Sequence, residues 1–130
     1  MLDHLSIGVT NLERAVAFYD AVLSPLGYVR VWSDKGAAGY GPPGKDDAFT
    51  IKREEAGALT LPRRLHIAFT ATNRTAVRAF HAVGLGYGAA DDGAPQVHGE
   101  YGQNYFAAFI IDADGYRIEA VYHEPQTATP

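Results

Sequence analysis

The sequence predicts an α+β fold in which the order strand, helix, strand, strand, strand occurs twice. The main observation is a near-repeat: residues 2–11 and residues 65–73 each contain a histidine, then an apolar run, then a Thr-Asn pair. A second echo is the Leu-Gly-Tyr triplet, found at 26–28 and again at 85–87. The copies lie about half of the 130-residue chain apart. Two related halves therefore account for the whole sequence.

In the first half, apolar spacing and turn residues define each expected element. Residues 5–9 form a short apolar run and predict a strand. Thr10 and Glu13 match a capping box, in which the Thr10 hydroxyl accepts from the Glu13 amide and the Glu13 carboxylate reaches back. A helix with apolar residues at helical spacing follows, and Pro25 and Gly27 end it. Further strands are expected at 28–33, 37–40 and 48–53.

The second half repeats this order. A strand is expected at 65–70, and Thr72 or Asn73 caps the helix that follows. Residues 93–95 form a turn, with short strands on either side. The remaining expected elements are strands at 105–111 and 117–122, a turn at 112–115 and a frayed tail at 125–130. We expect one domain over 1–130, with module one at 1–56, a linker at 57–64 and module two at 65–124.

The composition is that of an ordinary globular domain. A chain of 130 residues with 47% hydrophobic and 20% charged residues can bury a substantial core. The net charge is −4 without a long basic run, so nucleic acid is not an expected partner. The absence of cysteine excludes disulfides and thiolate sites and fits a cytoplasmic protein. We expect neither a signal peptide nor a membrane partner, because the necessary apolar stretches are missing.

Three residues are candidate metal ligands. His4 and His66 each open the first apolar run of a repeat, and equivalent positions in two halves favour a metal over two separate structural histidines. Glu119 lies among apolar neighbours in the last strand, where an unpaired carboxylate would be costly to bury. Its partner is either an arginine such as Arg64 or a divalent metal. Two imidazoles and a carboxylate suit Zn, Mn, Fe or Ni and leave positions for water or substrate.

These residues stand in a sequence that resembles the vicinal oxygen chelate superfamily, which groups glyoxalases, fosfomycin-modifying thiol transferases, extradiol dioxygenases and bleomycin-sequestering proteins. The resemblance covers almost the whole chain. It rests on segments 2–4, 12–15, 18–19, 25–28, 106–109, 112–115 and 118–121, together with Val9 and Leu23. It implies two βαβββ modules that form a cupped mixed sheet around a divalent metal held by His4, His66 and Glu119. It further implies a homodimer, in which the modules pair within one chain or across two.

Two positions depart from the patterns of individual members. Residues 48–53 carry no acid at the centre of the strand, where glyoxalases place a carboxylate that serves as ligand and base. Thr50 is the nearest match, which argues against isomerisation of a hemithioacetal. Phe109 stands where extradiol dioxygenases have a tyrosine, so ring cleavage would lack its usual acid/base partner. No counterpart of the anion pocket of the fosfomycin-modifying members is identified in the sequence.

Other residues are candidates for the rest of the site. In the 96–101 segment, an acid/base role is weighed against that of a solvated loop; its candidate catalytic residues are His98, Glu100 and Tyr101. Aromatic rings with a polar group suit the lining of a substrate pocket, and ordinary packing is the alternative. The candidate pocket residues are Trp32, Tyr40, Thr50, Tyr105 and His123. His81, on the second helix, is expected to be structural.

The expected function is that of a divalent-metal-dependent enzyme acting on a small oxygen-bearing substrate chelated to the metal. Lyase, transferase and ring-cleaving reactions all remain open, because members of this superfamily run different chemistry on one scaffold. One alternative is a non-enzymatic protein that sequesters a small molecule, as bleomycin-resistance proteins do. Another is a structural or interaction domain with a vestigial site.

Overall fold

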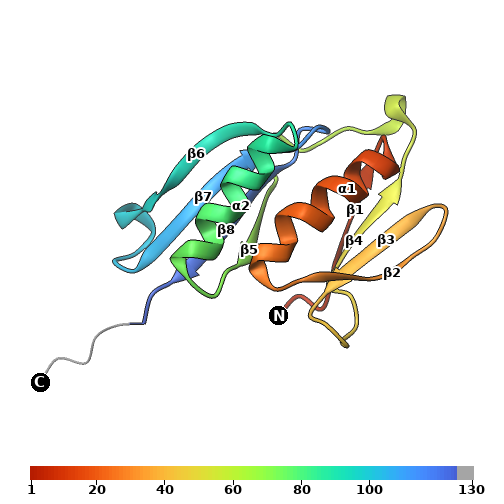
Figure 1. Ribbon diagram of the computed structural model, residues 1–130. Coiled ribbons are helices and arrows are strands. Elements are labelled where there is room, and N and C mark those ends of the chain that lie inside the picture. The colour runs from red at the N-terminus through yellow and green to blue at the C-terminus, as the bar shows by residue number, and fades with distance from the viewer. Residues whose placement is uncertain (126–130) are drawn as a thin grey trace, which may run out of the picture.

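The computed structural model describes residues 1–125 and contains two four-stranded mixed sheets, each with one long helix. Their strand orders are β1-β4-β3-β2 and β5-β8-β7-β6 (Figure 1). The pairs β1–β4 and β5–β8 are parallel. This confirms the predicted α+β fold of two βαβββ modules. The first module contains β1 Leu5–Val9, α1 Leu12–Leu23, β2 Val29–Ser33, β3 Ala37–Gly41 and β4 Phe49–Arg53. The second contains β5 His66–Thr70, α2 Arg74–Gly86, β6 Ala90–Val97, β7 Tyr105–Ile111 and β8 Arg117–His123.

The start of α1 differs from the predicted capping box. The N-cap is Asn11, whose side chain accepts from the Arg14 amide at 3.0 Å. The Thr10 hydroxyl instead donates to the Asp114 carboxylate at 2.6 Å, across the boundary between the modules. A charged acceptor makes a stronger hydrogen bond than a neutral one, so tertiary structure draws the Thr10 side chain away. The helix end is as expected, with Gly27 at a φ of 87° after a short 3-10 turn, η1 Ser24–Leu26.

The second module has one clear difference from prediction. α2 is capped by Asn73, one of the two residues expected there, which accepts from the Ala76 amide. Residues 93–95, however, do not interrupt the chain as a turn. They lie within the continuous strand β6, which pairs with β7 through two register shifts. Gly93 adopts a φ of 152° at this bulge, where a Cβ would lie 2.9 Å from Phe109 Cδ2, so glycine lets the strand bend without breaking.

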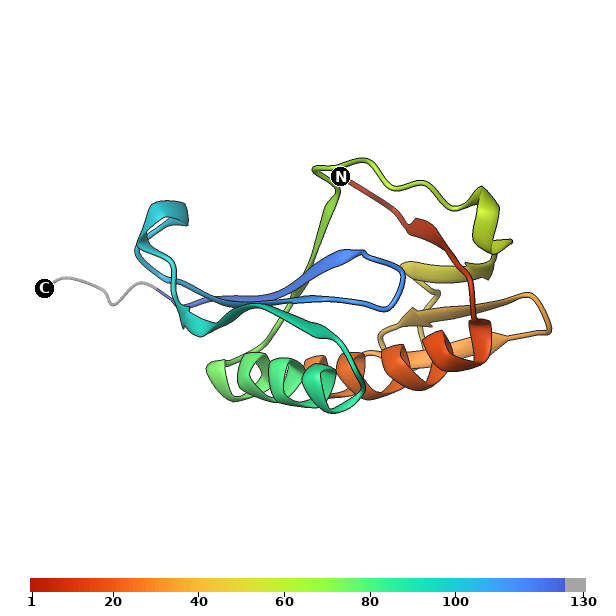
Figure 2. The ribbon, with the colours of Figure 1, turned by 90° about the horizontal axis from the view of Figure 1, so that it is seen from above.

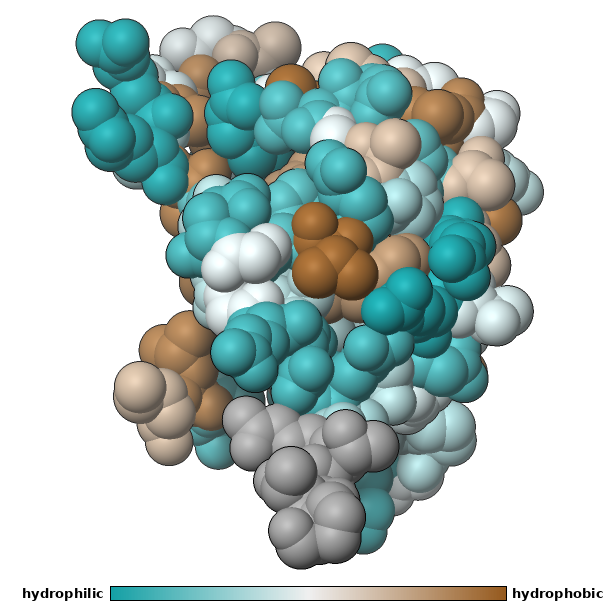
Figure 3. Space-filling model, turned by 90° about the vertical axis from the view of Figure 1, so that its left-hand side faces the viewer, coloured by the Kyte–Doolittle hydropathy of each residue, from teal (hydrophilic) through white to brown (hydrophobic). Residues whose placement is uncertain are grey.

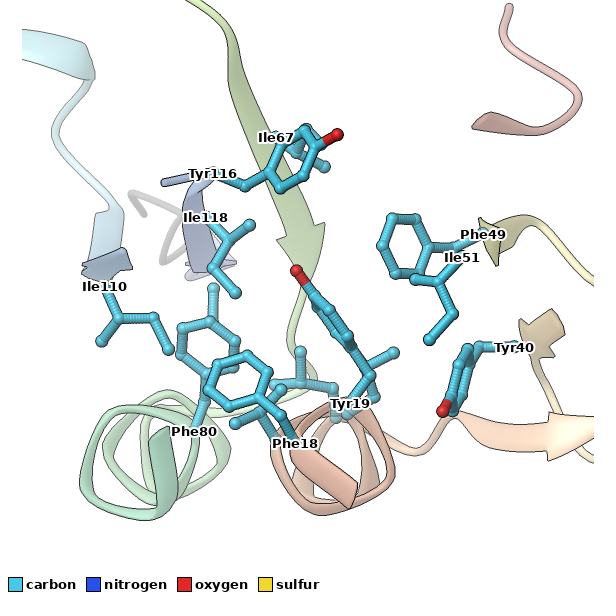
Figure 4. Packing of buried hydrophobic residues seen from close by; sticks show 14 of the residues in the cluster. Phe18, Tyr19, Tyr40, Phe49, Ile51, Ile67, Phe80, Ile110, Tyr116 and Ile118 are labelled. Atoms are coloured by element: carbon cyan, nitrogen blue, oxygen red, sulfur yellow. The ribbon is translucent and has the colours of Figure 1, made fainter. Parts of the chain in front are cut away.

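One hydrophobic core joins the two modules. α1 and α2 lie side by side along one side of the molecule (Figures 1 and 2). Figure 4 shows Tyr19 reaching from α1 into the space between the two sets of strands. Its ring packs on Phe49 at a centroid distance of 5.1 Å, and its hydroxyl donates to Asp112 of the second module at 2.5 Å. Burial raises the pKa of Asp112, although the Tyr19 hydrogen bond opposes this.

The outer surface near β6 is polar. Figure 3 shows this side of the molecule as largely hydrophilic, with hydrophobic residues in small separate groups. β6 is an edge strand, and Asp91 and Asp92 on it are exposed. Charged side chains on an edge oppose pairing with further strands. Among residues 1–125, no helix combines the length and the apolar character needed to cross a bilayer. Most of the tail expected at 125–130 falls outside the described residues.

Candidate metal centre

The strand register places the candidate ligands at equivalent positions in the two modules. In module two, Ala68 of β5 pairs with Glu119 of β8, and His66 lies two residues before Ala68 on the same strand. In module one, Ser6 of β1 pairs with Thr50 of β4, and His4 stands in the position of His66. Side chains alternate between the faces of a strand. The neighbours of these residues point into the helix-covered core, so the candidate ligands share the opposite face of each sheet.

His66 and Glu119 meet in the structure. The His66 Nε2 atom lies 2.6 Å from Glu119 Oε1, and the Glu119 side chain is fully buried. Tyr105 donates its hydroxyl to the other carboxylate oxygen, Oε2. Within the described part of the chain, Oε1 has no hydrogen-bond partner and no arginine pairs with this carboxylate. The ion pair with an arginine such as Arg64, one of the two alternatives considered for Glu119, is therefore not formed.

This pair fits a divalent metal. Two donors that each lie about 2.1 Å from a metal, at a right angle to one another, are about 3 Å apart. The observed separation of 2.6 Å is shorter and is that of a direct ion-pair contact, so the two side chains can reach one ion if they move slightly apart. A buried carboxylate oxygen with no hydrogen bond is costly unless a cation or donor satisfies it. Besides the His66 imidazole, Glu119 Oε1 has no polar partner in the described chain, so a metal ion next to His66 would suit this carboxylate.

His4 lies apart from this pair. Its side chain is exposed, and its Nδ1 atom lies 2.6 Å from the Asp3 carboxylate. A carboxylate on one ring nitrogen fixes the tautomer and leaves the other nitrogen able to bind a metal. Over residues 1–125 of a single chain, no three His, Cys, Asp or Glu side chains form a group that could hold a metal ion. One chain thus supplies a two-residue half-site at His66 and Glu119, and a separate histidine at His4.

The candidate catalytic residues lie beside the His66–Glu119 pair. The His98 ring packs edge-to-face on Phe109 at 5.1 Å, and Phe109 contacts the His66 ring at 5.8 Å. The Nδ1 atom of His98 lies 3.0 Å from Glu100, which helps to lower the pKa of that carboxyl group. The Nε2 atom is buried and has no hydrogen-bond partner among residues 1–125. Tyr101 stacks on the other side of the imidazole at 5.8 Å.

A hollow of about 310 Å³ opens next to these residues. Tyr105 and His123 line it, with their rings in edge-to-face contact at 5.1 Å. Tyr101, the polar segment 102–104 and Glu124 form the rest of its wall. Burial and the nearby Glu119 carboxylate raise the pKa of Tyr105, so its hydroxyl stays protonated at neutral pH. The hollow therefore adjoins the carboxylate through the Tyr105 side chain.

The candidates in module one divide between the two faces of its sheet. Thr50 and Trp32 lie near His4 on the face that points away from the helices, which we call the open face. Tyr40 lies on the opposite face, only 1% exposed, and donates its hydroxyl to Asp20 of α1 at 2.9 Å. Strand alternation places it in the core, so Tyr40 does not line a pocket with the others. His81 is also buried, 2.9 Å from Asp91, as expected for a structural residue.

Sequence reasoning did not single out three residues that contact these groups. Phe109 was considered only as a departure from the extradiol pattern, yet its ring separates His66 from His98. Asp3 was part of a matching motif, and its position next to His4 was a signal for a carboxylate–histidine pair. Asp47 contacts Thr50 through a hydrogen bond from the threonine hydroxyl. No local pattern distinguished Asp47 from its neighbour Asp46.

Comparison with known proteins agrees with the fold. The profile of the Glyoxalase/Bleomycin resistance protein/Dioxygenase superfamily matches residues 1–120. A search of curated proteins gave no match. Among solved structures, a glyoxalase/bleomycin resistance protein from Albidiferax ferrireducens T118 is 29% identical, with a TM-score of 0.79 over 92% of this chain and 97% of that one.

More distant structures share the fold alone. A glyoxalase/bleomycin resistance protein/dioxygenase family enzyme from Burkholderia phytofirmans PsJN is 16% identical, with a TM-score of 0.72 over 95% of this chain and 98% of that one. The fosfomycin resistance protein FosX from Listeria monocytogenes is also 16% identical, with a TM-score of 0.68 over 95% of this chain and 93% of that one. With a profile match over nearly its full length and the fold to accompany it, this chain belongs to the Glyoxalase/Bleomycin resistance protein/Dioxygenase superfamily.

Proposed function

We propose that the protein is a divalent-metal-dependent enzyme that acts on a small oxygen-bearing substrate chelated to the metal. The observation that carries this proposal is the buried Glu119 carboxylate, whose Oε1 atom lies 2.6 Å from His66 Nε2 and has no hydrogen-bond partner in the described chain. Superfamily membership supports a metal site on this face of the sheet.

The proposed site is completed by a second copy of the chain. His66 and Glu119 are already together, whereas His4 lies elsewhere on an exposed part of the same chain. The open face near His4 carries small exposed residues such as Ser6, and the face near His66 carries Ala68. Such side chains let two sheets approach closely. In a symmetric homodimer, His4 of each copy would join His66 and Glu119 of the other.

The chain's own residues would divide the work around the metal. When bound, a divalent ion supplies Lewis-acid stabilisation of developing negative charge on a substrate oxygen. Tyr105 fixes the orientation of Glu119 by donating to Oε2. Glu100 accepts from Nδ1 of His98, which leaves Nε2 in the form that accepts a proton. His98 is thus our candidate general base, and Phe109 and Tyr101 shield it from water.

Metal binding by variants tests the site. The wild-type protein, freed of metal by a chelator, is expected to bind Zn²⁺, Mn²⁺ or Ni²⁺ at one ion per chain in equilibrium dialysis. His66→Ala, Glu119→Gln and His4→Ala should each weaken binding at least about 100-fold, since each removes a ligand. His123→Ala, which removes a histidine from the nearby hollow, is the matched control and should bind as wild type. Unchanged affinity in all three ligand variants would overturn the proposal.

Mixed dimers test whether the site spans two chains. Co-refolding His4→Ala with His66→Ala chains gives heterodimers in which one site lacks both histidines and the other is complete. If the site spans the dimer, each heterodimer should recover one tight metal ion, although neither parent homodimer binds tightly. If each site is built within one chain, no tight binding returns. Size-exclusion chromatography with light scattering measures the expected dimer mass independently.

A sequestering protein on the same fold is the second candidate. It is favoured by the hollow beside Tyr105 and His123, which could hold a ligand without chemistry, and by Thr50 in place of an acid. The two candidates differ in turnover. The metal-loaded protein is screened with compounds that include epoxides, hemithioacetals and catechols. A compound that binds and is recovered unchanged supports sequestration over catalysis.

A further inference from the structure

A carboxylate lies on the open face of module one, although strand β4 itself has no acidic residue. Thr50 occupies the β4 position equivalent to Glu119 in β8. The Thr50 hydroxyl donates to Asp47 Oδ2 at 2.5 Å. Asp47 belongs to the segment that precedes β4, and this hydrogen bond draws its carboxylate to the Thr50 side chain. An acid from outside the strand thus lies beside the place where an acid in the strand would project.

The absence of a side chain at Gly39 makes room for this carboxylate. Gly39 of β3 pairs directly with Thr50. A Cβ on Gly39 would lie 2.2 Å from the Trp32 indole nitrogen and 2.9 Å from Asp47 Cβ. Both contacts are shorter than side chains tolerate. The absence of a side chain at Gly39 therefore lets Trp32 and Asp47 pack over the strand, on the same face as Thr50.

The surroundings of Asp47 favour its charged form. The hydrogen bond from Thr50 lowers the pKa of the Asp47 carboxyl group most, and the Trp32 indole and the positive form of His4 lower it further. Thr50 engages one oxygen, Oδ2. The Trp32 indole also donates to this carboxylate. An ionised carboxylate has about four lone-pair sites on its two oxygens, so it can still bind a cation.

We infer that Asp47 supplies the module-one carboxylate of the metal centre. This inference rests on the proposed function: His4 and Asp47 of one copy would face His66 and Glu119 of the other. The protein ligands would then number two histidines and two carboxylates, one of each from either module. A second carboxylate at the ion also reopens the isomerase class of reactions, against which the absence of an acid within β4 had argued.

The test compares two neighbouring aspartates. Asp47→Asn keeps the size of the side chain and removes its charge, and Asp46→Asn makes the same change at the adjacent exposed residue. Affinity for Zn²⁺ is measured by competition with a chromophoric chelator, in dimers matched for thermal stability. Asp47→Asn should weaken binding at least about 10-fold, since even indirect partners of a metal ligand contribute about 10- to 100-fold. Asp46→Asn should stay within about 2-fold of wild type.

Two further measurements distinguish a direct metal ligand from a residue that only lies near the metal. They also show which of the two proposals has failed. In the Co²⁺-loaded protein, Asp47→Asn should change the visible absorption bands, which report coordination number and donor set, whereas Asp46→Asn should leave them unchanged. Thr50→Val, which frees the Asp47 side chain, should give a smaller loss of affinity. If His66→Ala abolishes binding but Asp47→Asn matches wild type in affinity and spectrum, Asp47 is not a ligand and the proposed function stands. If His66→Ala also binds normally, the proposed function fails, and this inference fails with it.

Discussion

Replacing Tyr105 with phenylalanine should expose how the fold prepares the metal site. The substitution removes only the hydroxyl, which donates to Glu119 Oε2. Glu119 is fully buried, and its other oxygen already has no hydrogen-bond partner among residues 1–125. Tyr105→Phe therefore leaves the His66 imidazole as the one polar partner of this buried carboxylate among residues 1–125 of the metal-free protein. A hydrogen bond to a charged group contributes about 1.5–3 kcal/mol, so the variant should lose about that much stability.

The expected loss converts into a measurable change in melting temperature. An unfolding entropy of about 2.1 cal/mol/K per residue gives roughly 0.27 kcal/mol/K for 130 residues. A loss of about 1.5–3 kcal/mol then lowers Tm by roughly 6–11 °C. The assay is thermal unfolding by circular dichroism at pH 7 with a chelator present. Protein concentration is held fixed, because the proposed dimer would make Tm depend on it.

A matched control keeps the chemistry constant. Tyr28→Phe removes a hydroxyl that donates to the Thr70 carbonyl at 3.3 Å in an exposed place, so its effect should stay below about 0.5 kcal/mol. Tyr105→Phe should also raise the dissociation constant for the metal by about 10-fold or more, since Tyr105 orients a ligand. A Tyr105→Phe protein as stable as Tyr28→Phe, with wild-type metal affinity, would refute this account of Glu119.

Three further changes test the fold that positions the site. Tyr19→Phe removes the hydroxyl that donates to Asp112, whose pKa is raised by burial. The variant should lose about 1–3 kcal/mol of unfolding free energy at pH 7. Because the hydrogen bond favours the charged carboxylate, this loss should shrink as pH falls through the raised pKa, as measured by urea unfolding at several pH values. Gly41→Ala would bring a Cβ within 2.5 Å of the Asp46 carbonyl oxygen and should lower Tm strongly, whereas Gly57→Ala, with open space around it, should not. Asn11→Ala removes the N-cap of α1 and should cost about 1 kcal/mol in the same unfolding assay, while Thr10→Val should spare the cap and lose the bond to Asp114 instead.

The repeat in the sequence was sufficient to predict the fold, because apolar periodicity and turn residues are local signals. The α1 segment shows where this reasoning stops. Its length followed from spacing, but its cap moved from Thr10 to Asn11 because a carboxylate from module two takes the Thr10 hydroxyl. β6 shows the same limit, since a Gly-Ala-Pro turn signal became a bulge once the Phe109 side chain packed against Gly93.

The candidate site was predictable in its residue types and not in its assembly. The resemblance assigned His66 and Glu119 to one site. The structure places their side chains 2.6 Å apart because β5 and β8 are parallel neighbours. Tyr40 was misplaced because its ring and hydroxyl suit a pocket and a core equally well, and only the strand register assigned it to the core.

The sequence by itself determined that two similar modules are present, that each begins with a histidine, and that only the second ends in an acid within its strand. Tertiary structure alone decided that His4 stands apart from His66 and Glu119 within one chain. It also decided that Asp47 lies against Thr50, where the missing acid would be. The physical reason is that strand and helix periodicity arise from neighbouring residues, whereas a metal site or a buried carboxylate depends on which distant side chains the packed sheets bring together.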